Sequence, residues 1–344
     1  ATINSVTVGK GANSVAGNTV LGETALDASV SGENNTAIGK NALTTLTSGT
    51  KNSALGSGAL QLNTTGDFNT ALGSLTLDAN TTGANNTACG EGSLSANTTA
   101  SNNTAVGFQA LEENTTGTEN VALGAIALTA ATTASYNTGI GRYALGNTTT
   151  GESNTGVGHN VLKENTTGTQ NVAVGGSTLD ANTTGGANTA IGENALGANT
   201  TASNNVAVGR VALGANSTGT QNVAVGTNSL DANTTANNNT GVGYNSLTAN
   251  TTGTKNTALG SNTLVANTTA DNNTALGYLS LYDNTTGANN TAVGMNCLSA
   301  NTTADDNTGV GYFALAANTT GTSNTALGKG TVRMNSTGSD NTGV

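Results

Sequence analysis

The residues of this sequence that could take part in chemistry are, first, asparagines followed two positions later by serine or threonine. Such Asn-Xaa-Ser/Thr triplets accept N-linked glycans in a secretory host. The candidate acceptors are Asn63, Asn80, Asn97, Asn114, Asn165, Asn182, Asn199, Asn233 and Asn250. The alternative is a turn with a stacked ladder of amides, because acceptors about 4.8 Å apart on successive coils would crowd their glycans.

A row of aromatic residues is the second candidate. Tyr244, Tyr278 and Tyr312 are spaced 34 residues apart, and Phe108 falls in the same register. Exposed rings in a row could stack on sugars or attach to a surface. The alternative is that these rings pack against a neighbouring subunit.

Paired threonines such as Thr115 and Thr116 recur in most repeats. A flat threonine array could bind ice, although β-propensity and solubility also explain these residues. Adjacent residues of an extended chain alternate in direction, so only one threonine of each pair could face such a surface.

Other reactive residues do not form a recognisable site. His159 is the only histidine and has no cysteine in its repeat, which argues against a metal. The acid pairs Glu112-Glu113 and Asp305-Asp306 are adjacent in sequence, whereas a glycosidase needs two carboxylates across a cleft. No glycine is followed by the Lys-Ser/Thr of a phosphate-binding loop. We therefore expect no enzymatic activity, no cofactor and no metal site.

One repeat positions all of these residues. The asparagine equivalent to Asn103 recurs every 17 residues, 20 times from Asn18 to Asn341, without a change in spacing. We number coil positions from Asn103 (position 1) to Glu119 (position 17). A strict short period means that each unit buries its apolar side chains only by stacking on the next. The sequence predicts an all-β fold, a parallel β-solenoid, continuous over residues 18–344, with residues 1–17 forming an irregular, shorter first coil.

Each coil position predicts a structural role. Position 5 is glycine from Gly22 to Gly328, which indicates a positive φ or a close backbone approach. We expect a strand at positions 1–4, a second strand near positions 7–10 and a loop at positions 11–17. Positions 2 and 4 share one face of the first strand, and with the leucine of position 9 they are expected to form the core. Asparagines equivalent to Asn103 and Asn114 are expected to form amide ladders between coils.

Position 3 is alanine or glycine in 19 of 20 coils. We expect it to point away from the core and, because it is held small, to pack against another chain. The predicted subunit-interface residues are Ala105, Ala122, Ala173, Ala190 and Ala207. A core of three apolar side chains per coil is thin, so we expect lateral association, most simply a homotrimer.

The two cysteines are not expected to pair. Cys89 and Cys297 belong to coils that are twelve repeats apart, or about 58 Å at roughly 4.8 Å per coil. A disulfide requires a Cα separation of about 5.5 Å. Both cysteines are expected to fill small apolar positions.

Asn34-Asn35-Thr36-Ala37-Ile38-Gly39 and, more closely, Asn4-Ser5-Val6-Thr7-Val8-Gly9 resemble the Asn-Ser-Val-Ala-Ile-Gly signature of YadA-like (Hep/Hag-type) head repeats. Those repeats belong to trimeric autotransporter adhesins and also occur in phage tail fibres. The resemblance implies a left-handed parallel β-roll, three chains side by side and an extracellular role in attachment. The coil of this chain is a few residues longer than the family's usual coil. No ligand-binding residue is carried over, because the matching motif is the structural one.

Composition argues against two classes of function, nucleic-acid binding and membrane insertion. The net charge is −10, and the nine lysines and arginines are scattered, so no basic stripe exists for nucleic acid. No run of about 20 apolar residues predicts membrane insertion. We expect an extracellular fibre or adhesin segment, cut from a longer protein, on a cell or virion surface. A solenoid that binds carbohydrate (cell-surface glycans or a host surface) or ice is the alternative.

Overall fold

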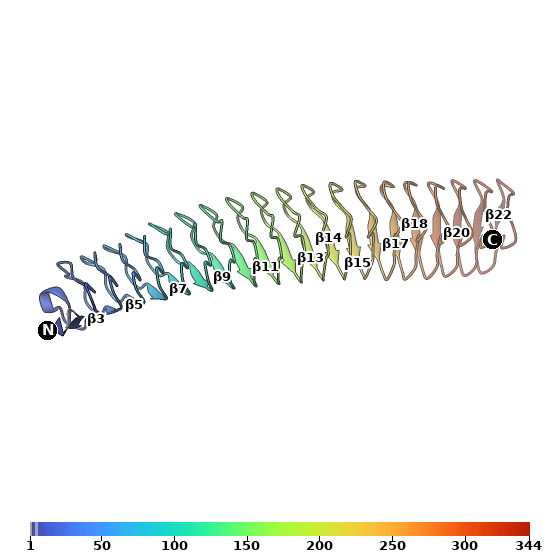
Figure 1. The fold of residues 1–344 in the computed structure, drawn as a ribbon. Helices are drawn as coiled ribbons and strands as arrows, with labels where there is room; N and C mark the ends of the chain where they lie inside the picture. The colour runs from blue at the N-terminus through green and yellow to red at the C-terminus, as the bar shows by residue number, and fades with distance from the viewer. Residues whose placement is uncertain (1, 4–5) are drawn as a thin grey trace. The chain divides into compact units, whose positions relative to one another are not determined.

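The computed structural model describes residues 2–3 and 6–344, so Asn4 and Ser5 of the repeat-like hexamer lie outside the described residues. The described chain is all-β except for one 3-10 helix, η1 (Ala12–Ser14). It divides into two compact units, residues 1–170 and 171–344. Each unit is a stack of 17-residue coils with one short strand per coil, which confirms the predicted parallel β-solenoid (Figure 1).

In the first unit, two antiparallel pairings precede the regular stack. Strand β1 (Thr2–Ile3) pairs antiparallel with β2 (Val6–Gly9), and β2 pairs antiparallel with β3 (Thr19–Gly22). From β3 onward, neighbouring strands are parallel, and each residue pairs with the residue 17 positions later. The remaining strands of this unit are β4 (Thr36–Ile38), β5 (Ser53–Leu55), β6 (Thr70–Leu72), β7 (Thr87–Cys89), β8 (Thr104–Val106), β9 (Val121–Leu123), β10 (Thr138–Ile140) and β11 (Thr155–Val157).

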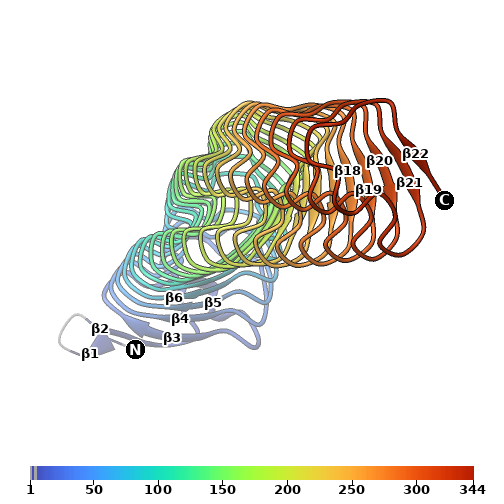
Figure 2. The same ribbon diagram turned by 90° about the vertical axis from the view of Figure 1, so that its right-hand side faces the viewer.

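The second unit repeats the same parallel, in-register pairing. Coils in this unit follow one another with the same outline, and β18 to β22 lie side by side (Figure 2). Its strands are β12 (Val172–Val174), β13 (Thr189–Ile191), β14 (Val206–Val208), β15 (Val223–Val225), β16 (Thr240–Val242), β17 (Thr257–Leu259), β18 (Thr274–Leu276), β19 (Thr291–Val293), β20 (Thr308–Val310), β21 (Thr325–Leu327) and β22 (Thr342–Gly343).

The strand face that points into the core is the opposite of the face that we expected. Position 3 points inward, whereas positions 2 and 4 point outward. The prediction of a subunit interface at position 3 is therefore wrong, because these alanines are 0% exposed within the single chain: Ala105, Ala122, Ala173, Ala190 and Ala207. They are small because the interior is narrow. At Gly139, which holds position 3 in its coil, an added methyl would lie 3.2 Å from the carbonyl oxygen of Ala144 and 3.4 Å from Leu128 Cδ1.

The predicted second strand does not form in any coil that the structure describes. Positions 7 and 9 have left-handed backbones, with φ 53° at Gln109 and 52° at Leu111. Gln109 N–H donates to the carbonyl of Glu91 in the preceding coil at 3.0 Å, and Leu111 N–H donates to the carbonyl of Ala127 in the following coil at 3.0 Å. This turn segment therefore joins neighbouring coils by hydrogen bonds without being extended. Its leucine fills the core, as expected.

The glycine of position 5 meets both expectations. Gly107 has φ 140°, and a Cβ placed there would lie 2.5 Å from the carbonyl carbon and oxygen of Gly124 in the next coil. Residues with a Cβ rarely adopt this φ, and the stacked backbones leave no room for one.

We predict that Gly107→Ala destabilises the chain strongly. The backbone conformation alone costs about 1–3 kcal/mol, and the clash with Gly124 adds to it. Gly92→Ala is the matched control: Gly92 has φ 68°, a Cβ there meets only Gln109 Cγ at 3.5 Å, and the left-handed backbone costs about 1–2 kcal/mol. Urea unfolding followed by circular dichroism measures both variants. Equal stability of the two would contradict the stacking geometry.

Candidate functional site

The nine candidate glycosylation asparagines hold position 12, inside the coil. Asn114 Nδ2 donates to Asn97 Oδ1 and to the carbonyl of Gly117, both at 3.0 Å. Asn103, at position 1, donates to the same Gly117 carbonyl at 2.9 Å, and its Oδ1 accepts the N–H of Asn120 at 3.0 Å. The predicted amide ladders at positions 1 and 12 are confirmed.

Glycan attachment at these nine positions is incompatible with the folded coil. Every one of the nine side chains is fully buried: Asn63, Asn80, Asn97, Asn114, Asn165, Asn182, Asn199, Asn233 and Asn250. A transferase could not reach their amides without opening the coil, and a glycan would break the ladder. The expectation that they are available acceptors is corrected by their burial.

A different set of Asn-Xaa-Ser/Thr triplets lies on the surface, and the sequence analysis missed it. Asn85 and Asn102 hold position 17, are exposed, and precede the buried asparagine and the strand threonine of the next coil. The same exposed arrangement occurs at Asn34, Asn238, Asn272 and Asn289. Asn147 does not belong to this missed set: its triplet is one of the Asn-Thr-Thr candidates, and it is exposed because Thr148 takes position 12 in its coil. The signal that separates the two sets is the coil position of the asparagine.

In the first unit, the position-12 ladder is interrupted after Asn114. Asn114 Oδ1 and Thr148 Oγ1 are buried without a hydrogen-bond partner. Between them, Ala131 holds position 12 and has no amide to donate to Asn114. Buried polar atoms without partners cost stability, so this coil is a weak point of the unit.

The outer face of the strands carries a column of exposed aliphatic side chains. In the first unit, Leu55, Leu72 and Val106 at position 4 are exposed, and a shallow hollow lies between Ile38, Leu55 and Leu72. In the second unit, the same column contains the exposed side chains of Ile191, Leu259, Leu276 and Leu327. Exposed apolar surfaces of this kind are typical of sites where proteins contact other molecules.

The two cysteines occupy different surroundings. Cys89 holds position 4 on the outer face of β7 and is partly exposed. Cys297 is buried at position 8, and burial raises the pKa of its thiol to about 12. At neutral pH the Cys297 thiol therefore stays protonated, which fits a small apolar side chain in the core.

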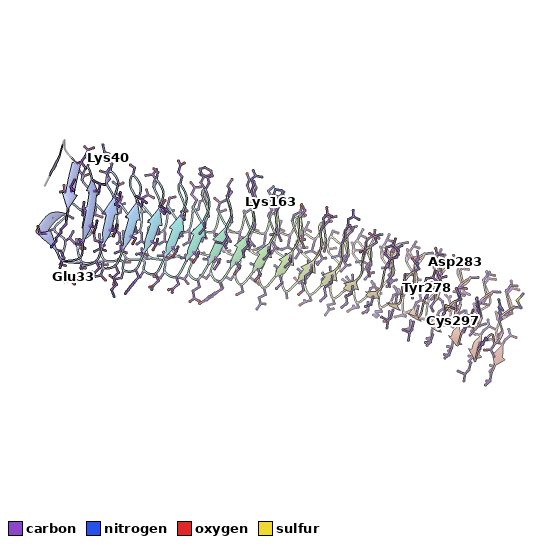
Figure 3. The ribbon with its side chains drawn as sticks, turned by 90° about the horizontal axis from the view of Figure 1, so that it is seen from below. Glu33, Lys40, Lys163, Tyr278, Asp283 and Cys297 are labelled. Atoms are coloured by element: carbon purple, nitrogen blue, oxygen red, sulfur yellow. The ribbon has the colours of Figure 1, made fainter. Side chains whose placement is uncertain are left out.

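The aromatic row at position 6 is accessible. Phe108 in the first unit and Tyr244, Tyr278 and Tyr312 in the second are all exposed. Figure 3 labels Tyr278 of this row. It also labels Lys40, which holds position 6 in the first unit. Lys40 and Glu33, which holds position 16, lie on opposite edges of the stack. Tyr312 is packed edge-on against Phe313, with 4.4 Å between the ring centroids.

The remaining candidates are not brought together. His159, the Glu112-Glu113 pair and the Asp305-Asp306 pair lie in different coils. Among the residues that the structure describes, no three histidine, cysteine, aspartate or glutamate side chains are grouped as a metal site. The described part of the chain also contains no helix with the length and apolar character needed to cross a bilayer. No family model matches this sequence, and no curated protein matches it.

We predict that Ala131→Asn stabilises the chain by about 1–2 kcal/mol, because it gives Asn114 Oδ1 a donor and offers an acceptor on the side of Thr148. Asn97→Ala should have the opposite effect, a loss of about 1–3 kcal/mol, because it creates a second gap in an intact part of the ladder. Urea unfolding of both variants measures the difference. A destabilising Ala131→Asn would show that the ladder does not contribute to stability.

Proposed function

We propose that this chain is a segment of an extracellular structural fibre, the shaft or head of an adhesin, surface filament or phage tail fibre, and that it assembles as a homotrimer. The observation that carries this proposal is the column of exposed aliphatic side chains on the outer face of the strands. The resemblance to YadA-like head repeats supports the number three and the extracellular location.

The physical role of such a segment is mechanical. Each coil adds about 4.8 Å of length. Within each unit, neighbouring coils are joined by strand pairing and turn hydrogen bonds, and most of them also by two amide columns. Bending a unit would strain all of these bonds together, so the stack is stiff. Repetition also presents the same outward side chains many times, which favours multivalent attachment.

The subunit interface in this proposal is the face of positions 2 and 4. Position 2 is mostly threonine or valine, and position 4 is valine, leucine, isoleucine or, once, cysteine. Such a flat face of short side chains can pack against an equivalent face of a second copy, with the strands in register. Three copies arranged around one axis would cover the exposed aliphatic column of each copy.

We predict a trimer at micromolar concentration and its loss in Leu72→Lys. Leu72 is 43% exposed on the outer face, so a lysine costs the isolated chain little but places charge in the interface. The matched control is Leu62→Lys, because Leu62 is 46% exposed at position 11, away from the strands. Light scattering coupled to gel filtration gives the mass of each variant. A monomeric parent chain, or loss of the trimer only in Leu62→Lys, would refute the proposed interface.

Carbohydrate binding by the position-6 row is a second candidate, favoured by the exposure of its rings. We predict that, in this case, Tyr278→Ala weakens glycan-array binding about tenfold, a loss of about 1.4 kcal/mol. Tyr136→Ala is the control, because Tyr136 is exposed to a similar extent (55% against 49% for Tyr278) but holds position 17. Absence of glycan binding by the parent chain, or equal losses in both variants, would reject this candidate.

Ice binding receives less support from the geometry. Thr115 Oγ1 donates to the carbonyl of Thr132 in the next coil at 3.0 Å, so the position-13 hydroxyls are engaged within the stack. Of the two paired threonines, only the one at position 14, represented by Thr116, is exposed. One column of hydroxyls is a poor match to a two-dimensional lattice of water.

A further inference from the structure

A hollow of about 310 Å³ lies over Gly92, on the side of the first unit that carries positions 6 to 10. Its walls come from three successive coils. Asp78 belongs to the first coil, Glu91 to the middle one, and Phe108 and Glu112 to the third. The hollow is on a different side of the coil from the outer strand face, so the proposed subunit interface does not use it.

The hollow exists because Gly92 has no side chain at position 7. The neighbouring coils carry Leu75 and Gln109 at this position. A Cβ on Gly92 would meet only Gln109 Cγ, at 3.5 Å, so the space above this residue is open. Ser95, at position 10, also lines the hollow, and its small side chain leaves the space open.

The charge around the hollow is entirely negative. No lysine or arginine occurs between Lys51 and Arg142, while this stretch contains six acids: Asp67, Asp78, Glu91, Glu112, Glu113 and Glu119. Three of the six line the hollow. Carboxylates in a concave surface concentrate a negative potential and attract cations.

Two of the carboxylates that line the hollow, those of Glu112 and the half-buried Asp78, have defined surroundings. Glu112 Oε1 accepts a hydrogen bond from Gln109 Nε2 at 2.9 Å, which fixes this carboxylate beside Phe108. Asp78 Oδ1 is buried without a hydrogen-bond partner, and burial raises the pKa of Asp78, although nearby backbone N–H groups act in the opposite direction. The exposed ring of Phe108 supplies an apolar and π-rich wall.

We propose that this hollow binds an organic cation with two protonated amines. The carboxylates of Asp78 and Glu112 lie two coils apart, which corresponds to about 10 Å along the stack. A short diamine can span this separation, with its methylenes against Phe108. A bare metal ion fits less well, because these described carboxylates do not converge on one point.

The test uses 1,5-diaminopentane as the probe and its neutral counterpart, 1,5-pentanediol, as the ligand control. Calorimetry and saturation-transfer NMR on the full chain should show one diamine site and no diol binding. Raising the salt concentration from about 0.02 M to about 0.5 M should weaken the diamine binding, because screening reduces the attraction. Equal binding of the diol, or no binding of the diamine, would overturn the proposal.

Two variants locate the site. Gly92→Gln fills the hollow without changing its charge and should weaken diamine binding about tenfold, or about 1.4 kcal/mol. Its control is Gly330→Gln, because Gly330 also holds position 7, has φ 67° against 68° at Gly92, and has open space around it. Asp78→Asn keeps the shape, removes one charge, and should also weaken binding if Gly92→Gln does not fold. Unchanged binding in Gly92→Gln, or in Asp78→Asn, would place the diamine elsewhere.

Discussion

The structure depends on the need to pair polar groups inside a narrow coil. In the coil of Asn103, the amides of Asn103 and Asn114 both donate to the carbonyl of Gly117, at 2.9 and 3.0 Å. The Oδ1 of Asn103 then accepts the backbone N–H of Asn120 in the next coil. Burying an amide without partners would cost several kcal/mol, so each coil must present the same groups to the next. This requirement explains why the 17-residue spacing never changes.

The same constraint determines which surfaces remain available. Two buried asparagines, a leucine and two small residues fill the interior, and the alanine of position 3, such as Ala105, is fully buried among them. The aliphatic residues of position 4 are therefore excluded from the core and form an outer column. Residues at positions 6, 7 and 10 also face outward, and they can vary without disturbing the ladders. One missing side chain there, at Gly92, is enough to open a hollow.

Much of this architecture could be predicted from the sequence, because a strict repeat places identical residues in identical surroundings. The parallel solenoid, the amide ladders of Asn103 and Asn114, and the glycine at position 5 follow from that logic.

The repeat alone does not determine which face of the strand points into the core. Alternation shows that positions 2 and 4 share a face, but it does not show which face is inside. Apolar side chains at position 4 favoured the wrong choice, because an outer face that another chain covers is also apolar. The turn at positions 7 to 10 was missed because leucine rarely adopts the left-handed φ that Leu111 has. The hollow at Gly92 arises from three successive coils and has no signature in any single repeat.

Hydrogen exchange of asparagine side-chain amides tests the central claim most directly. NMR on chain labelled with ¹⁵N only at asparagine separates protected amides from exposed ones. If asparagines at positions 1 and 12 form buried ladders, their side-chain protons will exchange orders of magnitude more slowly than those of exposed asparagines at position 17, such as Asn85 and Asn102. Fast exchange of all asparagine side chains in the folded chain would contradict the buried ladders and the inward orientation of the coil that depends on them.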